Sequence, residues 1–166
     1  MTTSNLPADF DLLDGTLDDL ADLKKFEPNP VGSYRMGIAW ETPANDEFVV
    51  VQLKLNTLEC IEVPNVAEEN LPPVGKVATF SMRLQRVDKQ PMVWEKDGTP
   101  NDQDQGRFKE ILLALAPVFN PDGSLSNRGM MEASEGAEVY VTLGVRASKK
   151  DPDAKFNFIK AIALVE

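Results

Sequence analysis

One segment of the chain, residues 106–119, has apolar residues at the three- and four-residue spacing of an α-helix. Its apolar face consists of Phe108, Ile111, Leu112, Leu115 and Phe119. Charged residues such as Arg107 fall nearer the other side, and Pro117 removes a backbone donor close to the end. The pattern predicts a single amphipathic helix.

The other folded segments show the two-residue alternation of half-buried β-strands. Three come before the helix, at residues 33–41, from residue 47 onward, and at 76–84. Two more follow it, at 137–147 and 155–165. The second strand is long, and its apolar phase slips by one residue after Leu55, which predicts either a bulge or the end of the strand.

Three aromatic residues on these strands allow more than one interpretation. Trp40 continues the apolar alternation of the first strand and is expected in the core, with base stacking as the alternative. In the last strand the inward face is ambiguous, and we expect one of Phe156 and Phe158 to be a core residue.

The element order β-β-β-α-β-β predicts a mainly β protein, a five-stranded OB-fold barrel with one helix between strands three and four. We divide the chain into an acidic N-terminal arm, residues 1–30, and an OB-fold domain, residues 31–166. In the arm Leu13, Leu17 and Leu20 share one helical face, which predicts a short amphipathic helix there.

Composition narrows the function classes. The chain has 166 residues, 42% of them hydrophobic, which is enough for one core, and its net charge is −10. It has no histidine and one cysteine, which excludes Ser-His-Asp and Cys-His catalysis and an ordinary zinc site. We expect no enzyme, cofactor or metal; the alternative is a magnesium nuclease with paired carboxylates at Asp102 and Asp104, or at Asp151 and Asp153.

The sequence also bears on location. No apolar run approaches the length of a membrane span, and the N-terminus lacks the basic and apolar regions of a signal peptide. A single cysteine agrees with a reducing compartment. We therefore expect a cytoplasmic protein that does not contact a membrane.

Charge is unevenly distributed along the chain. Residues 1–30 carry seven acids against two lysines, a net charge of −5. The predicted hairpin between the last two strands and its flanks has a net charge of +3 instead. In so acidic a chain, this basic excess favours a site for a polyanion.

An OB-fold binds oligonucleotides across its second and third strands and through the loops joining strands one to two and four to five. Binding of a single strand requires cations along the path of the phosphates. It also requires aromatic rings on which the bases stack. Trp94 belongs to a long polar insertion, residues 85–105, where it either folds over the barrel end or stacks a base. The candidate nucleic-acid-binding residues are Arg35, Lys54, Arg83, Arg86, Trp94, Arg146, Lys149, Lys150, Lys155, Phe156, Phe158 and Lys160.

Three runs, GSYRMGIAWE (32–41), GRFKEIL (106–112) and KFNFIK (155–160), resemble small bacteriophage single-stranded DNA-binding proteins of OB-fold type. The resemblance implies a non-catalytic protein that coats single strands without sequence specificity during phage DNA replication or recombination, in the host cytoplasm. Many such proteins recruit partners through an acidic C-terminal tail, whereas the acidic segment here is N-terminal.

We therefore expect single-stranded DNA as the ligand, and replication or recombination proteins as partners of the acidic arm. The oligomeric state stays open, a homodimer included. The alternative is an acidic interaction or inhibitor protein that mimics DNA and binds a basic host protein, which the net charge favours and the basic hairpin opposes.

Overall fold

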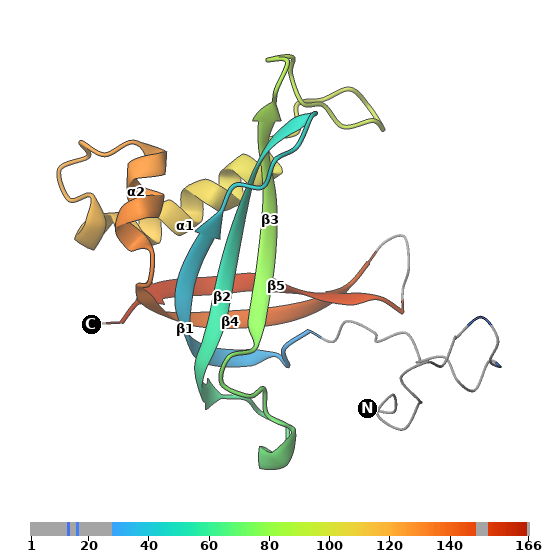
Figure 1. Ribbon diagram of the computed structural model, residues 1–166, viewed down its shortest axis with the longest axis vertical. Coiled ribbons are helices and arrows are strands. Elements are labelled where there is room, and N and C mark those ends of the chain that lie inside the picture. The colour runs from blue at the N-terminus through green and yellow to red at the C-terminus, as the bar shows by residue number, and fades with distance from the viewer. Residues whose placement is uncertain (1–12, 14–15, 17–27, 149–152, 166) are drawn as a thin grey trace.

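The computed structural model describes residues 13, 16, 28–148 and 153–165. Five strands form one antiparallel sheet in the order β3-β2-β1-β4-β5 (Figure 1). The strands are β1 (Gly32–Glu41), β2 (Phe48–Glu62), β3 (Val77–Arg86), β4 (Glu138–Ala147) and β5 (Lys155–Leu164). The predicted mainly β class and the five strands are confirmed.

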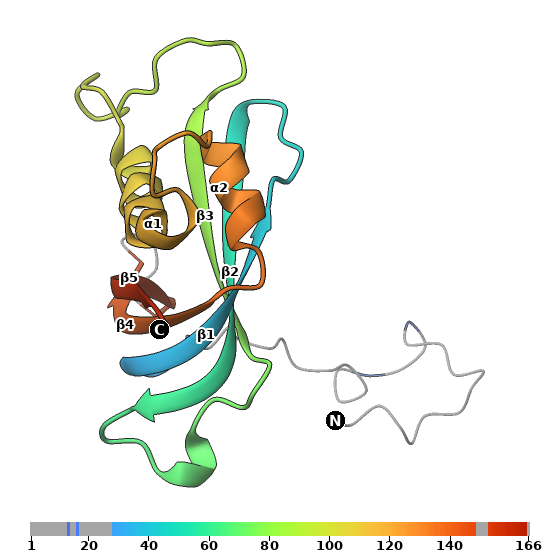
Figure 2. The same cartoon turned by 90° about the vertical axis from the view of Figure 1, so that its left-hand side faces the viewer.

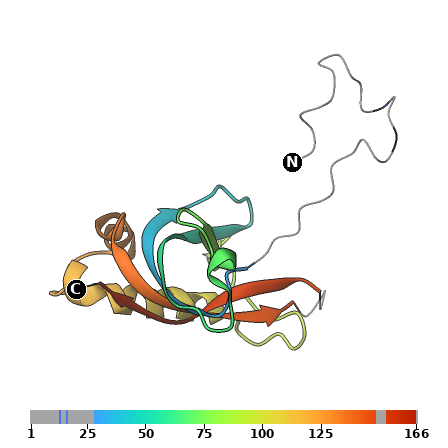
Figure 3. The same ribbon diagram turned by 90° about the horizontal axis from the view of Figure 1, so that it is seen from below.

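The predicted five-stranded barrel is not formed, because the sheet does not close over the described part of the chain. Within the described residues β3 and β5 are the two edges of the sheet and do not pair with each other, although the strands curl around a common interior (Figure 3). Part of the β3 edge is covered from the side: the N–H of Arg83 donates to Oδ2 of Asp104 at 2.9 Å, and Nε2 of Gln105 donates to the carbonyl of Leu84 at 2.7 Å. These side chains satisfy edge groups that a ladder to β5 would otherwise use.

The prediction of one helix between β3 and β4 is also wrong, because two helices lie there. They are α1 (Gln103–Phe119) and α2 (Asn127–Ser134). The shorter one begins at Ser126, whose Oγ accepts the N–H of Gly129 at 3.0 Å, and it buries Met130 and Met131. At eight residues, in a polar segment, α2 shows too few apolar positions to reveal a helical period. A single 3₁₀ turn, η3 (Glu68–Asn70), lies between β2 and β3.

The core lies inside the bend of the sheet, where α1 packs (Figure 2). The helix contributes Phe108, Ile111, Leu112 and Leu115, as its apolar spacing predicts. The central strands contribute their alternating apolar residues, among them Tyr34 and Leu143, both fully buried. Burial of these apolar faces is the main force that holds helix and sheet together.

The phase slip in β2 is confirmed as a pair of irregularities. The register to β1 shifts twice, between Ser33 and Tyr34 and between Arg35 and Met36. Such bulges increase local twist and curvature, which the curled sheet requires. Trp40 packs on the core with its ring edge toward Phe108, the centroids 5.9 Å apart, so its assignment to the core is confirmed.

In β5 the expectation that Phe156 or Phe158 belongs to the core is wrong. The residues of β5 that pack on the core are Ile159, Ile162 and Leu164. A register shift opposite Thr142 and Leu143 changes the phase of β5, which is why two isoleucines three residues apart face the same interior.

The described chain enters the domain through a hydrogen-bonded anchor. The N–H of Asn29 donates to Oδ1 of Asn157, and Nδ2 of Asn157 donates to the carbonyl of Asn29, both at 2.8 Å. Apart from Leu13, the predicted helical face of the arm lies outside the described residues. Neither helix in the described ranges combines the length and apolarity that crossing a membrane would take.

Candidate nucleic-acid interface

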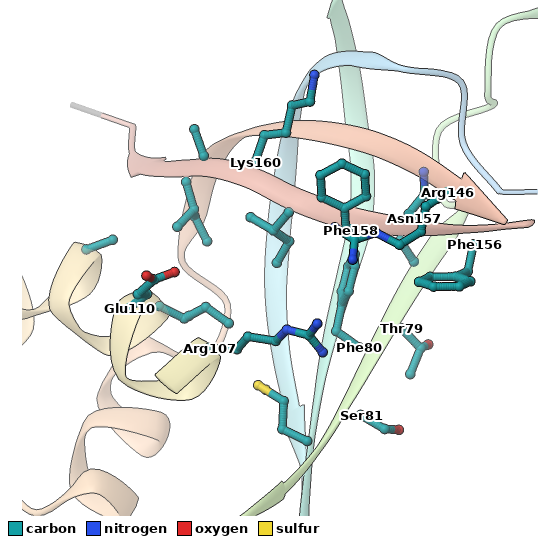
Figure 4. Close-up of a pocket in the computed structure, with 17 residues that line it drawn as sticks. Thr79, Phe80, Ser81, Arg107, Glu110, Arg146, Phe156, Asn157, Phe158 and Lys160 are labelled. Atoms are coloured by element: carbon teal, nitrogen blue, oxygen red, sulfur yellow. The ribbon is translucent and has the colours of Figure 1, made fainter. Parts of the chain in front are cut away.

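A groove of about 580 Å³ lies where the sheet fails to close, between the edges of β3 and β5 and beside α1 (Figure 4). β3 lines it with residues 78–82, β5 with residues 156–162, and α1 with residues that include Arg107 and Glu110. Because the groove replaces the missing β3–β5 ladder, the open topology itself creates the site.

The groove carries an excess of positive charge. Its charged lining residues are Arg107, Arg146, Lys160 and the acidic Glu110. Arg107 pairs with Asp104 at 3.3 Å, but within the described ranges neither Arg146 nor Lys160 forms an ion pair with a carboxylate. With Glu110 as the acid of this lining, the charged side chains sum to a positive charge in a chain of net charge −10.

Aromatic rings lie beside these cations. Phe156 is 42% exposed, and Phe80 contributes a half-buried ring from β3. Phe156 pairs with Arg146 across the ladder, and Phe158 pairs with Gly144, so these side chains share one face of the β4–β5 hairpin. The guanidinium of Arg146 lies over the Phe158 ring, 4.1 Å from its centroid.

A second arginine–aromatic cluster lies at the other end of β3. The guanidinium carbons of Arg83 and Arg86 are 4.8 and 5.9 Å from the centroid of Phe48, at the start of β2. Arg86 is also held by Asp88 at 2.9 Å and Glu47 at 3.7 Å. The hydrogen bond from Arg86 lowers the pKa of Asp88 to about 2, so the pair stays ionised through the neutral range.

Two further predicted binding cations are neutralised by carboxylates. Arg35 lies between Glu59, at 3.3 Å, and Glu138, and its hydrogen bond to Glu138 is the main cause of its raised pKa. Lys54 pairs with Glu41 at 2.9 Å. Neither Arg35 nor Lys54 lines the groove. Their side chains therefore bring little free positive charge to a polyanion.

Of the remaining predicted residues, Trp94 and Lys155 do not line the groove. Trp94 is 43% exposed, in a tight turn where its N–H donates to the carbonyl of Thr99 at 2.9 Å. That turn belongs to the loop projecting beyond β3 (Figure 1). Lys155 is exposed next to Phe156. Lys149 and Lys150 lie outside the described residues.

Sequence reasoning missed three residues of these two clusters: Arg107, Phe80 and Phe48. The signal for Phe48 was present, because it falls on the polar face of β2 with Gln52 and Lys54, where an aromatic ring has no core to fill. Arg107 and Phe80 join the groove only because α1 and β3 pack beside β5, which local periodicity does not encode.

Of the carboxylates in the nuclease alternative, Asp104 has other partners, and Asp151 lies outside the described residues. Asp104 accepts the N–H of Arg83 and a hydrogen bond from Arg107, so it joins α1 to the edge of β3. Across the described ranges, no three acidic or cysteine side chains gather closely enough to hold a metal ion.

Comparison of the chain with protein-family models, with curated proteins and with solved structures gives no match.

Proposed function

We propose that this protein binds single-stranded DNA without sequence specificity, and that the strand lies in the groove between β3 and β5. The observation that carries the proposal is a group of side chains in that groove: Arg146 and Lys160, which form no ion pair within the described ranges, and the 42% exposed ring of Phe156. Elsewhere the predicted cations Arg35, Lys54 and Arg86 are held by carboxylates.

The chemistry of the groove favours a single strand over a duplex. Bases of a single strand can turn out and stack on a ring such as Phe156, whereas those of a duplex are already stacked and paired. Stacking on a phenyl ring tolerates any base, because every base has a π-face. Cations along the groove would contact phosphates, which makes binding steeply salt-dependent.

We also propose that the fold is an OB-fold that is open between β3 and β5. The support is the element order and the strand order β3-β2-β1-β4-β5, which a β3–β5 ladder would convert into a five-stranded barrel. OB-folds are partly open barrels that bind oligonucleotides at the strand 2–3 face and the adjoining loops. The groove and the Phe48 cluster both border β3.

The proposed role is protection of exposed strands in phage DNA replication or recombination. The acidic segment that precedes Asn29 is proposed to recruit proteins of the same process. Asn29 is hydrogen-bonded to Asn157, a lining residue of the groove, so Asn29 lies next to the proposed DNA site.

The deciding experiment is fluorescence anisotropy of labelled oligo-dT, titrated with the full chain at low and at moderate salt. We expect micromolar or tighter binding that weakens steeply with salt, and much weaker binding of a duplex of equal length. Reversing charge at Lys149 and Lys150 is expected to weaken the complex. No binding at low salt would refute the proposal and favour an acidic protein that captures a basic partner.

A further inference from the structure

The two phenylalanines of the groove differ in their surroundings. Phe156 and Phe158 are two residues apart on β5 and share a face, so sequence alone gives them the same role. Phe156 is 42% exposed, whereas the ring of Phe158 is covered by a neighbouring strand and a cation.

The Phe158 ring lies against the backbone of a glycine on β4. Its cross-strand partner is Gly144, and a Cβ added there would lie 2.3 Å from Cζ and 2.5 Å from Cε1 of the ring. A side chain at position 144 would displace the Phe158 ring, so glycine there permits the packing that is observed. A ring lying over a cross-strand glycine is a known device for restoring packing in a sheet.

The guanidinium of Arg146 lies over the same ring. Its Cζ is 4.1 Å from the Phe158 centroid, well within the distance of a cation–π contact. Within the described ranges no carboxylate pairs with Arg146, so the ring is the partner that the structure provides for its guanidinium. The contact leaves the guanidinium's charge and its donors available to a ligand.

We propose that Phe158 is a positioning residue that holds Arg146 over the groove for a phosphate, and that Phe156 is the ring on which a base stacks. Gly144 leaves room for the Phe158 ring, and that ring contacts the Arg146 guanidinium. Figure 4 shows Arg146, Phe156 and Phe158 at the same end of the groove. This division of roles rests on the proposed function.

The positioning role is testable without DNA. A ring under a guanidinium shifts the resonance of the arginine Nε–H by its ring current, so the Arg146 signal reports the contact in the full chain. We expect Phe158→Leu, which keeps an apolar side chain over Gly144, to abolish the shift, and Phe156→Leu to preserve it. Phe158→Tyr keeps an aromatic face and is expected to restore the wild-type signal. An Arg146 resonance unchanged in Phe158→Leu overturns the proposal.

Binding of oligo-dT separates the two roles. Each phosphate contact to a single strand contributes about 0.7 to the slope of log K against log salt concentration. Phe158→Leu and Arg146→Gln should each lower the slope by about that amount, and the double variant no further. Phe156→Leu should weaken binding about 5- to 150-fold at every salt concentration with the slope unchanged, as loss of one stacked base predicts.

The outcomes remain distinguishable. If Phe158→Leu weakens binding with an unchanged slope, Phe158 itself stacks a base and the proposed division is wrong. If the wild-type chain does not bind oligo-dT at low salt, the proposed function fails together with the DNA roles assigned to both rings. In that case the Arg146 resonance still decides whether Phe158 holds the guanidinium. Circular dichroism melts of each variant identify any that fail to fold. If Phe158→Leu is one of them, the wild-type chain carries the test, because an Arg146 Nε–H signal without a ring-current shift overturns the proposal.

Discussion

The indole N–H of Trp40 donates a hydrogen bond to Oγ of Ser134 at 2.9 Å and thereby joins β1 to α2. Ser134 is fully buried, and its Oγ also contacts the carbonyl of Met131 at 3.3 Å. The same indole packs edge-on against Phe108 of α1. One aromatic residue thus connects a strand with both helices, which explains why the apolar phase of β1 extends to its end.

Trp40→Phe should destabilise the fold and leave DNA binding unchanged. The substitution removes the donor and leaves a buried hydroxyl without it, at a cost of about 1–3 kcal/mol in the free energy of unfolding. Urea unfolding measures that cost, and oligo-dT anisotropy of the folded variant measures binding. A folded Trp40→Phe protein with strongly reduced affinity would show that the indole contacts the ligand.

Neutralising the groove cations should affect binding more than neutralising the paired ones. We expect the double variant Arg146→Gln, Lys160→Gln to lower the salt slope by about 1.4, which corresponds to two phosphate contacts. Its matched control is Arg35→Gln, Lys54→Gln, which removes the same charge from side chains held by Glu138 and Glu41.

Salt titrations of both double variants with one oligo-dT give the comparison. Equal losses of slope in the two variants would mean that binding follows the overall charge of the protein and does not depend on the groove.

The Phe48–Arg83 pair should matter only for longer ligands. Phe48 pairs with Arg86, which lies four residues along β3 from Met82, the last groove residue of that strand, about 13 Å at the rise of a strand. A strand that fills the groove must therefore extend further to reach Phe48. We expect Phe48→Leu and Arg83→Gln to weaken binding of oligo-dT near 16 nucleotides and to spare the shortest ligands near 4 nucleotides, the range of known OB-fold sites.

Arg128→Gln is the charge-matched control for that series, because Arg128 lies on α2 and lines neither the groove nor the Phe48 cluster. A loss of affinity that is the same at every oligonucleotide length would place Phe48 and Arg83 in the primary contact and contradict the order proposed here.

We expect the free energy of unfolding to fall at alkaline pH as Tyr34 loses its proton. Its hydroxyl donates to the carbonyl of Pro30 at 2.5 Å, and burial, with a smaller effect of Cys60, raises its pKa to about 12. The folded state therefore holds the proton more tightly than the unfolded state, whose tyrosine pKa is about 10. The contribution of the Tyr34 hydroxyl to the free energy of unfolding is complete below about pH 10 and is lost as the pH rises toward 12.

Urea unfolding of wild type and Tyr34→Phe between pH 9 and about 12 tests this. Tyr34→Phe should be less stable at pH 8, because the Pro30 carbonyl loses its donor, and its stability should fall less steeply above pH 10. Lysine titration affects both proteins equally and cancels in the comparison. Parallel curves for the two proteins would mean that the Tyr34 phenol does not control the alkaline transition.

The strands and the main helix were predictable because their signals are local. The alternation around Tyr34 and Leu143 and the helical spacing of Phe108 and Leu115 each report which side of an element is buried. The slip after Leu55 correctly indicated the irregular pairing of β2 with β1. The helix α2 was not predicted, because its eight residues include too few apolar side chains to show a helical period.

The same local signals misassigned the phenylalanines of β5. Strict alternation places one of two neighbouring aromatic positions inward, but the register shift opposite Leu143 changes the phase and leaves Phe156 and Phe158 outside the core. A bulge depends on the partner strand, so its position cannot be read from β5 alone.

The candidate site shows the same division. The sequence by itself determined which side chains are cationic or aromatic, the net charge of −10 and the absence of histidine. Only the tertiary structure decided that Arg35 and Lys54 are neutralised while Arg146 and Lys160 are free of ion pairs within the described ranges, because pairing depends on carboxylates brought close from other strands. It also left β3 and β5 unpaired, since side chains of α1 cover part of the β3 edge, and a groove lies where a closed barrel would have had a ladder.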